Sequence, residues 1–247
     1  MTFIKYQNIK LFRSYSFIPP YAFFIIGIML FYFYKNQMIL PSYASSMTLL
    51  YATLSWLTII NFNLDSIQEK HMLFIQFDSK LKYLNYKMLF SFLSSIPLVM
   101  FSILYPIITN RFSESFDLYT LILSIYLHLI IVMIAVLVTS FITVQRFFSQ
   151  KYSWLLLVLV YVLSIIKFAI VQSYPVLKFL LFFIPPVGNF LNLFNKTTSD
   201  IWSKEFILLN LEIVLFICIA IVLINYIYKK ASIINFGIRN THFLYVM

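Results

Sequence analysis

Residues Leu118–Val144 read LYTLILSIYLHLIIVMIAVLVTSFITV, an apolar run of 27 residues without an acidic or a permanently basic side chain. A helix rises about 1.5 Å per residue and the hydrocarbon core of a bilayer is about 30 Å thick, so this run can cross a membrane. Only Lys167 and Glu212 carry a full charge in the six runs of this kind. The other five runs are Phe17–Tyr34, Tyr43–Phe62, Met88–Ile108, Trp154–Val171 and Phe206–Tyr228. The pattern predicts an all-α integral membrane protein with six transmembrane helices.

The composition agrees with this class. The chain of 247 residues is 62% hydrophobic and 11% charged, whereas a soluble domain carries roughly a quarter charged residues. A membrane β-barrel is disfavoured because its strands alternate apolar and polar side chains, and the runs here are continuous. We expect one transmembrane domain over residues 1–247.

The basic residues indicate an orientation. If the N-terminus is cytoplasmic, twelve Lys and Arg residues fall on the cytoplasmic side and five on the outer side. This bias is typical of membrane proteins with cytoplasmic basic loops, so both termini are expected in the cytoplasm of a bacterial cell, with the chain in its cytoplasmic membrane. The net charge of +10 is thereby assigned to orientation beside membrane lipids, and no nucleic-acid partner is expected.

The segment 2–16 is predicted to be an amphipathic helix in the cytoplasmic interface. Ile4, Leu11 and Tyr15 share one helical face, while Lys5 and Arg13 lie away from it. Two prolines follow at positions 19 and 20, where a new helix can begin. The chain is therefore expected to turn there into the first span.

The loop 63–87 is the largest predicted cytoplasmic feature. Ser66 and Glu69 have the spacing of a capping box, which starts a helix, and Asp78 is expected to cap a second helix leading into the third span. The apolar ridge of residues 72–75 would then lie beside water. Such a ridge is typical of a contact with another protein, and contact with lipid headgroups is the alternative.

The segment 173–204 is predicted to lie on the outer face. It is apolar but is interrupted by Pro185, Pro186 and Gly188, so it is expected to form short helices that dip partly into the membrane. Irregular backbone at that depth must be covered by protein. We therefore expect it to pack against spans five and six or against a second subunit.

The sequence offers little for catalysis. With only three glycines it contains neither Gly-rich phosphate-binding motif, and it has no G-x-S-x-G or H-E-x-x-H pattern. We predict no enzymatic activity, no cofactor and no metal site. Lys167 and Glu212 are predicted at similar depths, either as a polar point on a substrate path or as a structural ion pair. His128, near the middle of span four, is either a proton relay or a histidine bonded to a neighbouring helix.

The whole arrangement resembles the membrane subunit of an ABC-2-type ATP-binding-cassette transporter. The likeness covers nearly the full chain and is carried by the interfacial helix, the six spans, the basic loop after span two and the broken segment after span five. Locally, residues 65–74 resemble the acidic-basic stretch that opens the family's coupling helix, and residues 77–87 resemble the return into span three. Where the family usually has Gly-Thr, this chain has His71-Met72.

The resemblance implies that a separate cytoplasmic ATPase subunit binds ATP and Mg²⁺, and that the chain pairs with a copy of itself or with a paralogous permease. It implies a second cytoplasmic contact at Arg146 and Lys151. The residues implied in coupling to the ATPase are Asp65, Glu69, Lys70, His71, Phe74, Asp78 and Lys80.

The expected function is that of an export permease for an amphipathic or hydrophobic substrate. Subunits of this size are similar to those that export bacteriocins, antimicrobial peptides or amphipathic toxins such as phenol-soluble modulins. The alternative is an immunity or sensor component that binds a peptide or lipid without transporting it. An ATP-independent transporter is a third class, for which we find no internal repeat.

Overall fold

The structure, a computed structural model, describes residues 2–115, 117–145, 150–178, 180–193 and 204–244. These residues form helices and turns, with one isolated bridge between Gln37 and Phe112 and no strand in the part described. The predicted all-α class is confirmed. The helices are α1 (Thr2–Ser14), α2 (Ile18–Phe31), α3 (Ile39–Asn63), α4 (Ile67–Gln76), α5 (Lys80–Leu93), α6 (Ile96–Ile108), α7 (Leu118–Val144), α8 (Gln150–Ser173), η1 (Pro175–Lys178), η2 (Leu180–Phe183), α9 (Val187–Leu193) and α10 (Lys204–Leu244).

Five of these elements are long and apolar enough to cross a membrane: α3, α5 with α6, α7, α8 and α10. A sixth membrane-spanning element is present only if α1 and α2, which meet at a bend of 81°, are counted together as one span. By itself α2 has 14 residues and a length of about 21 Å. The chain therefore has the character of a multi-pass membrane protein, with a first span shorter than predicted.

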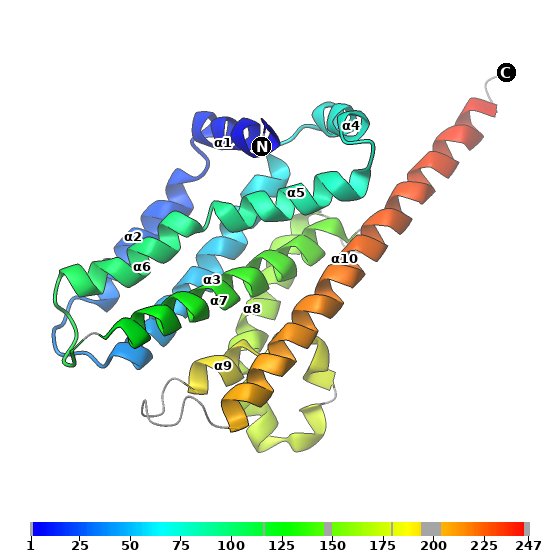
Figure 1. Cartoon of the computed structure of the whole chain (residues 1–247). Helices are drawn as coiled ribbons and strands as arrows, with labels where there is room; N and C mark the ends of the chain where they lie inside the picture. Colours follow the sequence, from blue (N-terminus) through cyan, green and yellow to red (C-terminus); the bar gives the residue numbers. More distant parts are fainter. Residues whose placement is uncertain (1, 116, 146–149, 179, 194–203, 245–247) are drawn as a thin grey trace.

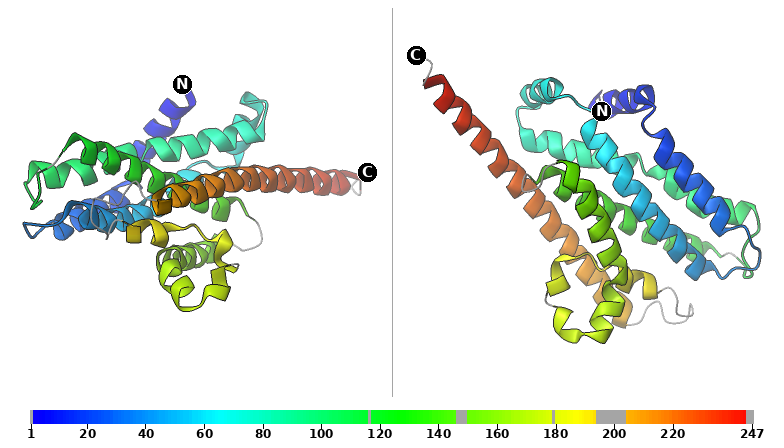
Figure 2. Two further views of the ribbon diagram at one scale, coloured as in Figure 1. Left: turned by 60° about the horizontal axis from the view of Figure 1, so that its bottom comes forward. Right: turned by 180° about the vertical axis from the view of Figure 1, so that it is seen from behind.

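Both ends of the described chain lie toward the same end of the bundle (Figure 1). There α1 and α4 lie across the ends of the long helices, and we call this the α1–α4 end. The far half of α10 projects beyond it. The opposite end carries η1, η2 and α9, beside the end of α8 and the start of α10 (Figure 2).

The bend between α1 and α2 has a local cause. Tyr15 has a φ of 54°, in the left-handed region that ends a helix. Pro19 and Pro20 then occupy the first turn of α2, where a missing backbone N–H costs no helical hydrogen bond. The turn follows Ser14, so the interfacial helix is two residues shorter than predicted.

The third span is divided at Ser94–Ser95, between α5 and α6. Pro97 lies in the first turn of α6 and cannot donate a backbone hydrogen bond. The backbone N–H groups of Leu98 and Val99 both donate to the Ser95 carbonyl, and the Ser94 carbonyl accepts from the Tyr21 hydroxyl at 2.7 Å. The carbonyl group left free at the break thus has a hydrogen-bond donor on α2. This pairing explains how an interrupted helix is kept in an apolar bundle.

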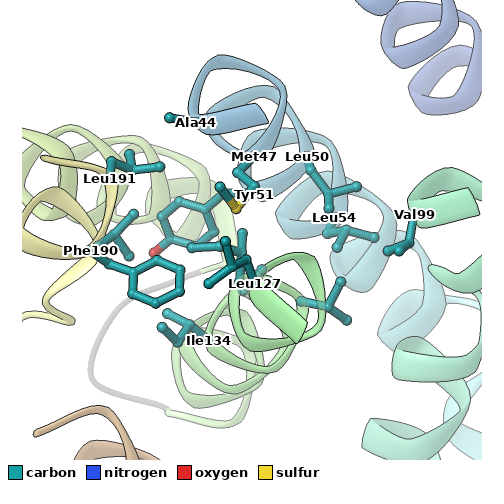
Figure 3. Packing of buried hydrophobic residues seen from close by; sticks show 14 of the residues in the cluster. Ala44, Met47, Leu50, Tyr51, Leu54, Val99, Leu127, Ile134, Phe190 and Leu191 are labelled. Carbon is teal, nitrogen blue, oxygen red and sulfur yellow. The ribbon is translucent and has the colours of Figure 1, made fainter. Parts of the chain in front are cut away.

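The core is centred on α3 and α7. In each of them 67% of the most apolar window is buried inside the chain, against 17% in α8 and in α10. Figure 3 shows Met47 and Tyr51 of α3, Leu127 and Ile134 of α7 and Phe190 of α9 packed together. Two helices therefore organise the bundle, while α8 and α10 expose most of their apolar surface.

Where the structure describes the interrupted segment after α8, it forms the predicted short helices η1, η2 and α9, and residues 194–203 of the predicted segment lie outside the described residues. Helix α9 packs against α8 and α10, and Phe190 is fully buried. A Cβ added to Gly188 would overlap the Ile165 carbonyl oxygen and lie 3.1 Å from that of Ser164. Ile165 is eight residues before the end of α8, or about 12 Å, so α9 reaches into the bundle.

Candidate functional site

Helix α4 begins with the predicted capping box. The backbone N–H of Glu69 donates to Ser66 Oγ at 3.2 Å, and the backbone N–H of Ser66 donates to Glu69 Oε2 at 2.7 Å. Two otherwise unpaired donors are satisfied in this way. This matters because an isolated ten-residue helix is marginal in water, so α4 needs its cap and its tertiary contacts to stay formed.

Asp65, just before α4, is the centre of a buried polar cluster. Its side chain has no exposed surface and accepts hydrogen bonds from two elements, α1 and α5. Lys87 Nζ of α5 donates both to Asp65 Oδ2 and, at 2.8 Å, to Gln7 Oε1 of α1. The remaining donors are Gln7 Nε2 at 3.0 Å, Lys10 Nζ at 3.1 Å and Tyr83 Oη at 2.7 Å. We call Gln7, Lys10, Asp65, Tyr83 and Lys87 the Asp65 latch.

A second layer of polar contacts joins α1 to α4 at the edge of the Asp65 latch. Lys10 Nζ donates to Glu69 Oε2 at 2.6 Å, and the Tyr6 hydroxyl donates to Glu69 Oε1 at 3.2 Å. The Glu69 side chain thus belongs to the capping box of α4 and also accepts hydrogen bonds from α1. The two helices at this end are tied by charged groups rather than by apolar packing alone.

The two carboxylates at this end, Asp65 and Glu69, stay ionised across neutral pH. Burial by itself raises the pKa of Asp65, but the Lys87 charge and the hydrogen bonds from Lys87, Gln7 and Tyr83 outweigh it and hold that pKa at about 2. The hydrogen bonds from Lys10 and the Ser66 backbone lower the pKa of Glu69 to about 2. Because the pKa of Asp65 is depressed on folding, its stabilisation is present above about pH 4 and is lost as the pH falls toward 2.

The exposed face of α4 differs from the predicted ridge. Ile67, Met72 and Ile75 are 76%, 71% and 78% exposed. Phe74 is half-buried, since its ring lies 5.2 Å from that of Tyr83. Of the predicted ridge, Met72 and Ile75 are thus exposed, and Phe74 is half-buried because its ring packs against that of Tyr83 in α5.

The other residues predicted at this loop take several places. His71 is exposed next to Phe74, at 5.9 Å between ring centroids, and Lys80 Nζ lies 5.7 Å from the Phe74 ring. Lys70 is half-buried, and this burial lowers its pKa. Asp65, which was expected to take part in coupling, is buried within the Asp65 latch directly before α4.

Asp78 is not the cap of α5. It has a φ of 52°, and its backbone N–H donates to the Ile75 carbonyl at 3.2 Å. Ser79 is the residue before α5, without a side-chain cap. The predicted cap is wrong because Asp78 ends α4 in the left-handed region, which aspartate tolerates better than most residues.

Of the two residues expected to form a second cytoplasmic contact, only Lys151 is among the described residues. Arg146 lies outside them, in the connection between α7 and α8. Lys151 is in the first turn of α8. Both positions follow the end of α7 that points toward the α1–α4 end (Figure 1).

Lys167 and Glu212 are brought together, as predicted. Lys167 Nζ lies 3.5 Å from Glu212 Oε1 and donates to the Ile184 carbonyl at 2.7 Å. Lys167 is 4% exposed, whereas the Glu212 side chain is 42% exposed. The shorter bond goes to the backbone that leads into α9, so this lysine anchors the segment between η2 and α9.

This geometry predicts unequal effects of two substitutions. Lys167→Met should lower the free energy of unfolding by about 2 kcal/mol, because it leaves the half-buried Ile184 carbonyl without its donor. Glu212→Gln should cost less than about 1 kcal/mol, since Lys167 keeps its bond to Ile184. Unfolding of the purified variants in mixed micelles measures both values. Equal effects would show that the ion pair, and not the backbone bond, is the main contact.

His128 is fully buried in α7. Its Nδ1 is 2.7 Å from the Ser124 carbonyl oxygen, an acceptor, so Nδ1 carries the proton. Nε2 has no hydrogen-bond partner within the described residues, and the ring of Tyr43 packs edge-on at 5.4 Å. The bond stays within one helical turn, so the predicted bond to a neighbouring helix is not the one formed.

Sequence reasoning missed Gln7, Lys10, Tyr83 and Lys87 as partners of Asp65. A signal for them was present. An acid directly after an apolar run is costly unless it is paired, and lysines flank the neighbouring runs. The face of α1 that docks on the chain carries Phe3, Gln7 and Leu11, and it shares only Leu11 with the apolar face described from the sequence. A buried glutamine cannot be found by searching for an apolar stripe.

Comparisons of the chain with protein-family models, with curated proteins and with solved structures found no match.

Proposed function

We propose that the protein is the membrane subunit of an ATP-driven exporter, whose ATP is hydrolysed by a separate cytoplasmic ABC ATPase. One observation carries the proposal. At the α1–α4 end, a short capped helix presents Ile67, Met72 and Ile75 outward, each more than 70% exposed. Exposed apolar surface on a fixed element is typical of a protein contact, and α4 would seat in a cleft of the ATPase.

The connections of α4 suit the transmission of movement. Asp65 lies two residues after the end of α3, and its side chain binds α1 and α5 through the Asp65 latch. A rigid displacement of α4 would therefore be passed to α1, α3 and α5 together. An ATPase that closes on ATP would in this way tilt the helices around a substrate path.

A second permease subunit is part of the proposal. Helices α8 and α10 bury only 17% of their apolar windows within one chain, which leaves long apolar faces for lipid or a partner. Pairing with a copy or a paralogue would enclose a path for an amphipathic or hydrophobic cargo such as a peptide. The orientation follows the basic residues, which places the α1–α4 end in the cytoplasm.

Co-purification from detergent-solubilised membranes tests the proposal. Ile75→Glu and Met72→Glu should abolish recovery of an ATPase subunit, because each would place a charge against an apolar cleft. Ile108→Glu is the matched control: it is 75% exposed and lies at the opposite end, so recovery should be normal.

Two other results of this co-purification experiment would contradict the proposal. An ATPase that is recovered equally with all three variants would contradict the role of α4. If the wild-type chain recovers no ATPase under mild conditions, the proposal fails and an immunity or sensor component becomes the better explanation.

A further inference from the structure

An open groove of about 800 Å³ runs along α1 on the side away from the Asp65 latch. Its lining is mostly apolar, with two cations. One wall comes from α1, and one residue, Leu93, comes from the end of α5. The lining residues are Thr2, Ile4, Lys5, Asn8, Ile9, Phe12, Arg13 and Leu93.

Helix α1 therefore has two functional faces. Phe3, Gln7 and Leu11 recur every four residues and are buried against the chain. Ile9 and Phe12 lie on the groove side and are 44% and 57% exposed. If α1 only had to dock on the chain, its other face would carry polar residues. The exposed apolar residues on the groove side therefore require another explanation.

The groove carries positive charge without a counter-charge. Lys5 and Arg13 form no ion pair with any described residue, whereas Lys10 is held by Asp65 and Glu69. Lys5 and Arg13 are eight residues apart, which is about 12 Å along the helix. Two long side chains at this spacing flank the apolar centre of the groove and favour an anionic group between them.

Leu93 begins an apolar stripe that leaves the groove along α6. Ile96, Met100 and Leu104 follow at three- and four-residue spacing and are 39%, 55% and 40% exposed. The stripe runs within a membrane-spanning element. An apolar chain that starts in the groove could thus continue along the stripe through the depth of the bilayer.

We propose that this groove binds one anionic phospholipid of the surrounding membrane. Its phosphate lies between Lys5 and Arg13, and one acyl chain passes Leu93 and follows the stripe on α6. A basic residue at a membrane surface favours anionic lipid by about 1 kcal/mol, or about fivefold in affinity. This site lies apart from the exposed face of α4 and does not depend on an ATPase.

The test uses the full-length purified protein in neutral detergent, titrated with fluorescent phosphatidylglycerol and, separately, with fluorescent phosphatidylcholine. The wild-type protein should bind phosphatidylglycerol more tightly. The double variant Lys5→Gln/Arg13→Gln should weaken that binding roughly 30-fold while leaving phosphatidylcholine unchanged. Lys5→Arg/Arg13→Lys, which keeps both charges, should retain the preference.

Two further variants separate a built site from a general positive surface. Lys35→Gln/Lys82→Gln removes two exposed charges outside the groove and should leave both affinities unchanged. Leu93→Trp should weaken the binding of both lipids by filling the groove. Equal binding of the two lipids by the wild-type protein, or an equal loss in the Lys35 and Lys82 variant, would overturn the proposal.

Discussion

Replacing Asp65 with asparagine is expected to lower the free energy of unfolding by about 3 kcal/mol. The substitution keeps the shape of the side chain but removes the negative charge that Lys87 faces. Both side chains have no exposed surface, so the ammonium group would be left buried and without a counter-charge. Breaking a buried ion pair from one side typically costs about 3–5 kcal/mol. Steric trapping or denaturation in mixed micelles gives the value directly.

Two companion variants make this prediction specific. Asp78→Asn removes a carboxylate that is exposed at the end of α4, so it should change the free energy of unfolding by less than about 0.5 kcal/mol. The double variant Asp65→Asn/Lys87→Met removes both buried charges and should be more stable than Asp65→Asn alone. If the two single effects simply add in the double variant, the ion pair is not what stabilises this end.

The same substitution should release α1. Asp65 is the acceptor for Gln7 and Lys10, and these bonds hold the buried face of α1 against α5. Spin labels on α1 and α4 in the Asp65→Asn variant should give a broader distance distribution than in the wild-type protein. An unchanged narrow distribution would show that the apolar contacts of Phe3 and Leu11 are enough to hold α1.

Gly188→Ala is expected to be the more damaging of the alanine substitutions at Gly27 and Gly188, lowering the free energy of unfolding by about 3 kcal/mol. Its Cβ would overlap the Ile165 carbonyl oxygen and crowd the Ser164 carbonyl at 3.1 Å. Both are backbone atoms of α8 and cannot turn away. Helix α9 would have to move out of the bundle and would expose Phe190, so the cost lies at the upper end of the range for overpacking.

Gly27→Ala is the matched control for Gly188→Ala. Its Cβ would approach Leu49 Cδ2 at 2.5 Å, but that atom is the end of a flexible side chain. Alanine also favours a helix over glycine by up to about 1 kcal/mol. The variant should therefore be within about 1 kcal/mol of the wild-type protein. Thermal denaturation followed by gel filtration ranks the stability of the two variants. An equal loss of stability in both would contradict the close packing of α9 on α8.

The elements of the fold were predictable where they depend on local sequence. Helix α7 has the predicted bounds, and α4 begins at the capping box found from Ser66 and Glu69. Prolines and a glycine correctly indicated the short helices after α8. The break between α5 and α6 was missed, although Pro97 marked it, because the run around it is apolar enough to cross a membrane without interruption.

The candidate site was predictable only in part. The loop, its helix and its charges were found, and Met72 and Ile75 of the predicted ridge are exposed, whereas Phe74 is half-buried. Asp65 was expected to take part in coupling to an ATPase, and the structure places it in the buried Asp65 latch. The burial of Phe74 and of Asp65 could not be predicted for one and the same reason. Spacing along a helix shows which side chains share a face, and it does not show which face meets the rest of the chain.

The sequence by itself determined that this is a helical membrane protein, because in a bilayer each long apolar run must satisfy its own backbone hydrogen bonds. Only the tertiary structure decided which polar groups meet. Gln7 and Lys87 are 80 residues apart, and nothing local to either one indicates the other. Their meeting at Asp65 depends on how α1 lies across α5, and therefore on the packing of helices rather than on the pattern within any one of them.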